Sequence, residues 1–290
     1  MPPPRSTGLP GMDAQNDFQR ARRRSTISRL ISRLRGEPDD VGVVLPYEEV
    51  ISALGFVSEH RTGLHVVQLD AIVGSVDRSR DYDRRFRPTS GRSRSRWEQI
   101  AAAARRGESF PPVDLLKVGE LYFVRDGHHR VSVARALGRT DIDAYVTEVV
   151  TRVDADRAMK LSDLPFKSHE RVFFERVPLP HDARAEIELS DPWDFAVLAD
   201  AVEAWGFRAI QSRGDALDRK ETARLWLETE YRPAVALLRE LDLVGDATAT
   251  EAYMRIAAER YRLLRSRDWS EEVLRQVVQG RGGRRWARRS

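Results

Sequence analysis

The sequence predicts an α+β fold followed by a mainly helical region, and three patterns support that prediction. Residues 121–139 read as a buried strand, a sharp turn at Gly127 and a helix that ends at Gly138. Residues 142–150 alternate between apolar and polar side chains, which is typical of a half-buried strand. After Val150 the apolar residues recur at helical rather than strand spacing.

The N-terminal part is expected to be a disordered segment, residues 1–19, followed by a basic helical segment, residues 20–63. Arg20–Arg35 carries seven arginines and no acidic residue. Its apolar residues recur at helical spacing: Ile27, Leu30, Ile31 and Leu34. We expect a basic amphipathic helix that contacts nucleic acid, an anionic membrane or an acidic partner, or that docks on its own domain. A short helix should lie between Pro46 and Gly55.

Residues 64–152 are expected to form the α+β domain. An extended segment, Val66–Ile72, opens it, and Trp97–Arg106 reads as a helix that is stopped by Gly107. A hairpin around Val118–Glu120 then leads into the strand, turn and helix described above.

The turn, Asp126–Arg130, has the composition of an anion-binding site. A helix that starts directly after a glycine turn presents unpaired backbone N–H groups and the positive end of its dipole. Arg130 and the imidazoles of His128 and His129 add polar groups at that end. The alternative is an ordinary turn with solvated side chains. Because the two histidines are adjacent, at most one should face a ligand, and the histidines of the chain show no metal-ligand spacing.

The order of elements from Val66 to Val150, together with Asp126-Gly127-His128-His129-Arg130, resembles the nucleotide-binding fold of ParB-type partition proteins, sulfiredoxin and free-serine kinases. The resemblance implies a ParB/sulfiredoxin-like domain whose nucleotide or phosphate site comprises Asp126, Gly127, His128, His129 and Arg130. It also implies a nucleotide-dependent protein that associates with DNA or a protein partner, as in chromosome partitioning. The loop Arg78–Arg96, with eight arginines, would then lie near the nucleotide, with some arginines reaching phosphates and others solvated.

The branches of that superfamily differ at this motif. Sulfiredoxin uses a cysteine, and this chain has none. Partition proteins carry a later Glu-Asn-x-x-Arg segment, whereas the corresponding segment here runs from Glu148 to Arg152 with Val149 in place of the asparagine. A clamp-forming CTPase is therefore less favoured than the fold resemblance alone would indicate.

The amino-acid sequence of the motif, Asp126–Arg130, most resembles that of the free-serine kinases. That resemblance implies a nucleoside triphosphate or ADP with Mg²⁺, and a carboxylate base shortly after the first strand. Only Asp77, or Asp70 just upstream, is available as that base. Asp126 would hold Mg²⁺ or a substrate hydroxyl, or else cap the turn. NTP hydrolysis and phosphotransfer to a small metabolite both stay open as activities.

Residues 153–280 are expected to form a helical domain and residues 281–290 a basic tail. Helices should open at Asp191, Asp218 and Ser270, and a capping box at Thr248–Glu251 should start another. The first should end at Gly206, and the second should be kinked at Pro233. The pair around Gly245 has helix-turn-helix spacing, but its aromatic stripe is better explained as core. Three tryptophans should also serve packing: Trp193, Trp205 and Trp226. The arginines and glycines of the tail suit non-specific contact with DNA.

Composition adds limits on class and location. The chain has 290 residues, a formal net charge of +4 and no cysteine, which excludes disulfides and thiolate metal sites. No apolar run is long enough to cross a bilayer, and the N-terminus lacks the apolar core of a signal peptide. We therefore expect a cytoplasmic protein without a transmembrane segment.

Overall fold

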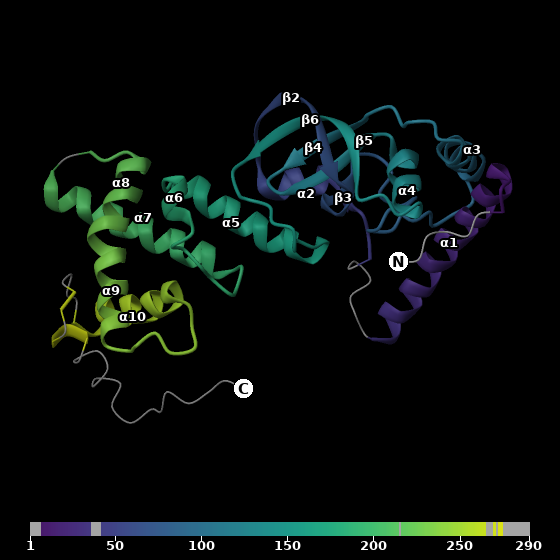
Figure 1. Cartoon of the computed structure of the whole chain (residues 1–290). Helices are drawn as coiled ribbons and strands as arrows, with labels where there is room; N and C mark the ends of the chain where they lie inside the picture. The colour runs from purple at the N-terminus through teal and green to yellow at the C-terminus, as the bar shows by residue number, and fades with distance from the viewer. Residues whose placement is uncertain (1–6, 36–41, 215, 265–268, 271, 275–290) are drawn as a thin grey trace. The chain divides into compact units, whose positions relative to one another are not determined.

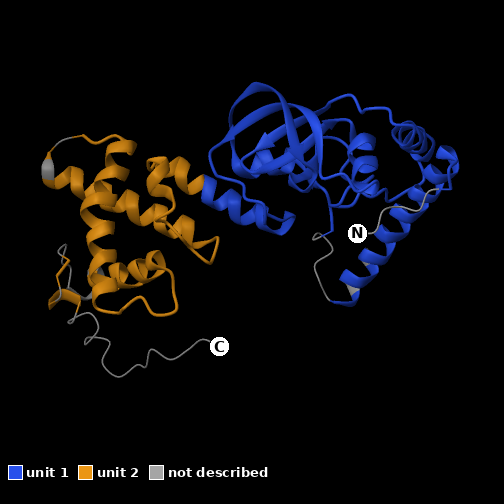
Figure 2. Cartoon of the chain, viewed as in Figure 1, with its two compact units in different colours: residues 1–171 blue, residues 172–290 orange. Residues whose placement is uncertain are grey.

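The computed structural model describes residues 7–35, 42–214, 216–264, 269–270 and 272–274. The chain divides into two compact units, Met1–Arg171 and Val172–Ser290 (Figure 2). Unit 1 combines helices with a mixed sheet of six strands, and the described part of unit 2 is helical (Figure 1). The α+β class and the helical C-terminal region are therefore both confirmed.

Unit 1 holds all the strands of the described chain. Its elements in order are α1 (Pro10–Leu34), β1 (Leu45–Pro46), α2 (Tyr47–Leu54), β2 (Phe56–Gln68), η1 (Leu69–Ala71), β3 (Ile72–Ser75), α3 (Arg94–Arg105), β4 (Val113–Val118), β5 (Leu121–Asp126), α4 (His128–Ala136), β6 (Asp141–Thr151) and η2 (Leu161–Asp163). The helix α5 (Leu164–Arg176) crosses the boundary to unit 2.

The strands follow the order β1-β3-β5-β4-β6-β2. The pairs β1–β3, β3–β5 and β4–β6 are parallel, whereas β4–β5 and β2–β6 are antiparallel. The edge strand β2 starts at Phe56, ten residues before the extended segment expected at Val66, because it pairs with β6 along its whole length. The parallel strands β3 and β5 end side by side, and α4 begins where β5 ends.

The sheet and α4 share one apolar core. Its fully buried members include Val113 and Leu115 on β4, Val124 on β5 and Val131 on α4. A second cluster joins α1, α3 and α4 around Trp97, whose indole N–H donates to Ser132 Oγ at 2.8 Å. Burial of this apolar surface fixes the position of α4, and therefore of the turn that precedes it.

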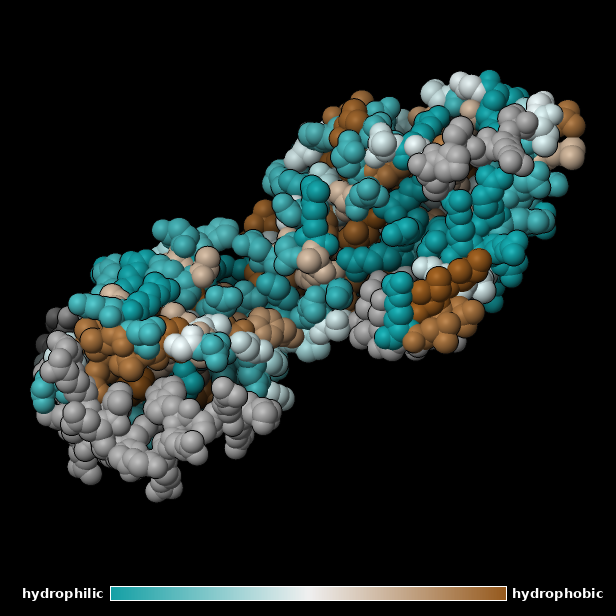
Figure 3. Space-filling model, turned by 60° about the horizontal axis from the view of Figure 1, so that its bottom comes forward, coloured by the Kyte–Doolittle hydropathy of each residue, from teal (hydrophilic) through white to brown (hydrophobic). Residues whose placement is uncertain are grey.

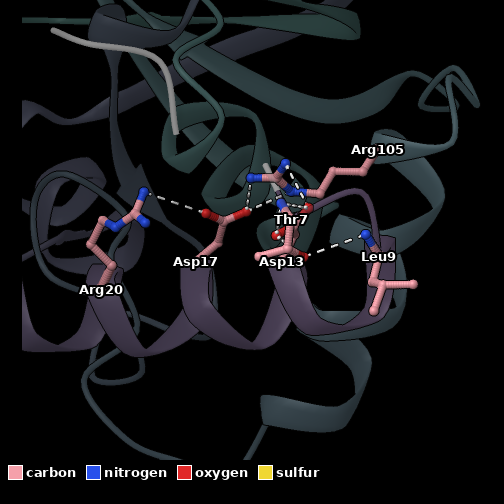
Figure 4. Close-up of polar contacts among 6 residues, drawn as sticks. All are labelled: Thr7, Leu9, Asp13, Asp17, Arg20 and Arg105. Carbon is pink, nitrogen blue, oxygen red and sulfur yellow. Dashed lines mark hydrogen bonds and ion pairs between the residues drawn. The ribbon is translucent and has the colours of Figure 1, made fainter. Parts of the chain in front are cut away.

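The helix α1 begins at Pro10, so the expectation of disorder over residues 1–19 is wrong for residues 10–19. Two buried carboxylates explain the difference. Asp13 and Asp17 both form ion pairs with Arg105 of α3, at 3.7 and 2.6 Å (Figure 4). Thr7 also donates from its backbone N–H to Asp13, at 2.9 Å. The acidic residues of this segment therefore anchor it to α3.

The basic half of α1 does not bury its apolar stripe. All four apolar side chains are exposed: Ile27, Leu30, Ile31 and Leu34. The helix instead docks through a buried stripe that lies earlier in the helix: Ala14, Phe18, Ala21 and Ser25. The face of unit 1 seen in Figure 3 is mainly hydrophilic, with a separate hydrophobic patch at its lower right edge. Docking through the four predicted residues is therefore excluded.

The described part of unit 2 consists of helices. They are α6 (His181–Arg184), α7 (Asp194–Arg213), α8 (Arg219–Trp226), η3 (Leu227–Tyr231), α9 (Arg232–Glu240) and α10 (Ala249–Leu264), with η3 a π-helical turn. Asp218 caps α8 by accepting from Glu221 N–H at 2.8 Å, and the π turn ends at Tyr231, two residues before Pro233. The capping box at Thr248 and Glu251 is also present.

Gly206 does not end α7, which continues to Arg213. A Cβ at Gly206 would lie 2.4 Å from Thr222 Cγ2, so this glycine permits the close approach of α8. Tyr253 and Ile256 of α10 are buried, which confirms that the stripe after Gly245 is core. Trp193, expected to pack, is 69% exposed.

Two predicted segments cannot be compared with the structure. The helix from Ser270 lies partly, and the tail 281–290 wholly, outside the described residues. Among the helices that the structure describes, none is long and apolar enough to span a membrane.

Candidate functional site

The turn between β5 and α4 requires glycine. Gly127 has φ 99° and ψ 19°, a left-handed conformation that other residues rarely adopt. A Cβ at this position would lie 2.5 Å from Cγ1 of the buried Val113. The first intrahelical bond runs from Val131 N–H to Gly127 C=O, so the amides of residues 128–130 have no partner within the helix. The sheet thus holds a helix start, with its positive dipole end, at the end of β5.

His128 is buried beneath the turn, where it joins β3 to α4. Its Nε2 lies 2.8 Å from the hydroxyl of Ser75, which also accepts from the backbone N–H of Arg78 at 2.9 Å. Tyr82 stacks on the imidazole with ring centroids 6.2 Å apart. Burial lowers the pKa of His128 to about 4, so the ring is neutral at pH 7. His128 therefore positions the turn as an uncharged group.

Asp77 lies beside His128. Its Oδ1 is 3.5 Å from His128 Nε2, and its side chain is 64% exposed. Asp70, the other carboxylate predicted as a base, lies on η1 before β3, whereas Asp77 follows the end of β3. Asp70 instead acts electrostatically on Arg135, near the other end of α4. The structure brings Asp77, and not Asp70, to the Gly127 turn.

His129 offers an unused polar atom. Its Nε2 is buried and has no hydrogen-bond partner. Burial lowers the pKa of His129, and the charges of Arg78 and Arg96 lower it further. A nitrogen in this position gains a hydrogen bond when a ligand group reaches it. Of the two adjacent histidines, His129 is thus the one with an unsatisfied ring nitrogen.

Arg130 is partly engaged within the chain. Its Nη1 donates to the carbonyls of Pro111 and Pro112, at 2.9 and 2.6 Å, and its Nη2 donates to Asp126 at 2.6 Å. These bonds use three of the five N–H donors of a guanidinium. Asp126 is 77% exposed and forms an ion pair with Arg130. Arg130 therefore clamps the loop before β4 and still has donors for an anion.

The Arg78–Arg96 loop is held by its aromatic residues. Tyr82 and Phe86 are buried and stack on each other at 5.7 Å. Phe86 has φ 55°, an uncommon left-handed conformation for a bulky residue. Sequence reasoning selected the arginines of this loop but missed Tyr82 and Ser75 as contacts of His128. The only signal for Tyr82 was an aromatic residue within a charged run.

Metal binding has limited support from the side chains alone. In the part of the chain that the structure describes, no group of three or more His, Asp or Glu residues could hold a metal ion. Mg²⁺ bound with a nucleotide needs only one or two carboxylates, because phosphates and water complete its shell. The exposed carboxylates of Asp77 and Asp126 fit that lesser requirement.

Comparisons with known proteins do not assign this chain to a family. The sequence matches no protein family and no curated protein. A solved structure, the C2221 form of a Pnob8-like ParB-N domain, is similar at 15% sequence identity. The match covers 78% of this chain and 96% of that chain, with a TM-score of 0.22. A TM-score of this size does not establish a shared fold.

Proposed function

We propose that unit 1 binds the phosphate groups of a nucleotide at the Gly127 turn, and that nucleotide binding regulates association with DNA, as in the ParB-type proteins that the motif resembles. The observation that supports this most directly is the start of α4. The amides of residues 128–130 have no partner within the helix, His129 Nε2 has no hydrogen-bond partner, and Arg130 keeps donors that its bonds within the chain do not use. Arg78 and Arg96 add positive charge close to His129.

An anion suits this site better than a cation or a neutral ligand. The free amides and the helix dipole favour negative charge, and guanidinium groups bind phosphate with paired hydrogen bonds. His128 stays neutral because it is buried, so it supports the turn without adding charge. The amides and the guanidinium groups would therefore bind the phosphate, and His128 would hold the turn in place.

Contact with DNA is proposed from the distribution of charge. Exposed arginines on α1 and the arginines of residues 281–290, which lie outside the described residues, would neutralise backbone phosphates without reading bases. Such binding is independent of sequence and weakens steeply with salt.

The test is titration calorimetry. Each nucleoside triphosphate and ADP, with Mg²⁺, is titrated into the wild type and into Arg130→Ala, and the two affinities are compared. Loss of a charge-assisted hydrogen bond should weaken binding by about 1.5–3 kcal/mol. The matched control is Arg125→Ala, which removes the same charge one residue before Asp126 and breaks an ion pair with Asp114. Equal affinity in the two variants, with the fold intact, would show that Arg130 serves only the loop at Pro111 and Pro112.

A second function, phosphotransfer to a small metabolite, is favoured by the position of Asp77. An exposed carboxylate beside the turn could take the proton of a substrate hydroxyl while that oxygen attacks the terminal phosphorus and the shortened nucleotide leaves. Mg²⁺, when bound, would neutralise charge on the phosphates. Asp77→Asn should then abolish transfer and spare nucleotide binding, whereas Asp70→Asn should change neither. No transfer by the wild type to amino acids or other small alcohols would reject this function.

A further inference from the structure

Unit 1 contains a large cavity at the opposite end of α4 from Gly127. Its volume is about 1300 Å³, and it is lined by α1, by the second half of α4 and by the loop at Asp83–Arg87. None of the residues 127–130 lines it. The described lining includes eight arginines against three aspartates. The cavity is therefore strongly positive and separate from the nucleotide site proposed above.

The aspartates do not balance this charge, because two of them are already paired. Asp17 lies 2.6 Å from Arg105, which is not part of the lining. Asp83 lies 2.8 Å from Arg87, with both side chains largely buried. Of the other lining arginines, Arg20 lies 3.6 Å from Asp17 and Arg157 lies 3.7 Å from Glu120. Four more line the cavity without an ion pair to a carboxylate that the structure describes: Arg84, Arg85, Arg135 and Arg139.

The two innermost arginines are held mainly by neutral carbonyl groups. Arg84 donates to the carbonyl of Met159 at 2.7 Å, and its Nη1 is buried without a hydrogen-bond partner. Arg135 donates to the carbonyls of Leu69 and Ile72, and its Nε is likewise buried without a partner. Burial lowers the pKa of both groups, that of Arg135 to about 10.

Buried cations without an anion are unfavourable, and an anion in the cavity would relieve that cost. The opposing forces are visible for Arg135, whose charge is disfavoured by burial and by Arg85 and favoured by Asp70 and Asp83. Several guanidinium groups around one space match a ligand with several phosphates better than a single carboxylate, because each can form paired bonds with phosphate oxygens.

Size and lining decide the kind of polyphosphate. A sphere of this volume would be roughly 14 Å across, whereas the major and minor grooves of a DNA duplex are together about 18 Å wide, so a duplex is too large to enter. Single-stranded nucleic acid is bound through stacking on aromatic side chains, and the described lining holds none. A compact chain of phosphates needs neither the space that a duplex requires nor aromatic side chains for stacking.

We propose that this arginine cavity binds a compact polyphosphate, a small molecule with several phosphate groups in a row, independently of the Gly127 turn. The ligand would bridge α1, α4 and the Asp83–Arg87 loop. Occupancy would therefore couple the docking of the basic helix α1 to the level of that anion.

Titration calorimetry with inorganic tripolyphosphate tests the proposal at physiological salt. Arg85→Gln with Arg139→Gln removes two charges from the cavity rim and leaves the buried Arg84 and Arg135 in place. The matched control is Arg92→Gln with Arg106→Gln, which removes two exposed charges of unit 1 that do not line the cavity. Binding should weaken at least tenfold in the first pair and less than twofold in the control. Far-ultraviolet circular dichroism verifies that both variants are folded.

Two further arms separate this proposal from the function proposed above. Tripolyphosphate should still bind to Arg130→Ala, and Arg85→Gln with Arg139→Gln should weaken binding of tripolyphosphate more than binding of an oligothymidylate. Loss of tripolyphosphate binding in Arg130→Ala alone would place the anion at the Gly127 turn and overturn the proposal. Equal losses in the rim and control pairs, or no binding by the wild type, would overturn it as well.

Discussion

Replacing Gly127 by alanine should destabilise unit 1 by about 2–5 kcal/mol. The left-handed backbone, with φ 99°, costs an alanine about 1–2 kcal/mol. The new methyl group would also lie 2.5 Å from Val113 Cγ1 and 2.9 Å from Val113 Cβ. Val113 is fully buried, so relief requires movement of β4 or α4, and such overpacking costs about 1–3 kcal/mol.

Gly138, after the other end of the same helix, provides the control. Its φ is 79°, but a Cβ there would meet nothing within 4 Å, so Gly138→Ala carries only the backbone cost of about 1–2 kcal/mol. Urea unfolding followed by circular dichroism gives both free energies. A Val113→Ala background removes the contact with Cγ1 and keeps the one with Cβ, so there the excess cost of Gly127→Ala over Gly138→Ala should fall. Equal costs of the two glycine substitutions in the wild type would refute the steric argument.

Three further predictions follow from buried or concentrated charge. The wild type should lose up to about 3 kcal/mol of stability between pH 6.5 and pH 4, because the unfolded His128 takes a proton near 6.5 and the folded one only near 4. A His128→Gln variant should lose that part of the pH dependence in urea unfolding, and an unchanged slope would contradict the assignment. Arg105→Met should cost about 3–5 kcal/mol, since it removes the cation that pairs with both Asp13 and Asp17, of which Asp17 keeps Arg20 at 3.6 Å, and limited proteolysis should then cut within α1. Resistance to cleavage equal to that of the wild type would show that the carboxylates are not what holds the helix. If the tail contacts DNA, deleting residues 281–290, which carry five arginines, should make the slope of log affinity against log salt shallower by up to about 4. An unchanged slope in fluorescence anisotropy would exclude the tail from the contact.

Local signals predicted much of the fold. Proline and glycine marked both ends of α2, and the capping residues Asp218 and Thr248 marked helix starts in unit 2. The left-handed Gly127 was also readable, because a glycine between an apolar strand and a helix has few other roles. These features depend on neighbouring residues alone.

Features that depend on residues distant in the sequence could not be predicted from local patterns. The helical state of residues 10–19 depends on Arg105, and the start of β2 at Phe56 depends on pairing with β6. Gly206 looked like a helix end, yet its reason is the close approach of Thr222. At the candidate site the motif supplied Gly127–Arg130, whereas Ser75 and Tyr82 reach His128 only through the fold.

The pairing of β2 with β6 has a consequence for synthesis on the ribosome. The two strands pair in antiparallel register from Gln68 with Asp141 to Phe56 with Thr151. Three other strands, β3, β4 and β5, come between them in the sequence. At about 5–20 residues per second, β2 is complete roughly 4–15 s before its partner begins to emerge. During that interval the backbone N–H and C=O groups of β2 that later pair with β6 have no strand partner. A nascent chain of this protein should therefore be a chaperone client until β6 has been made.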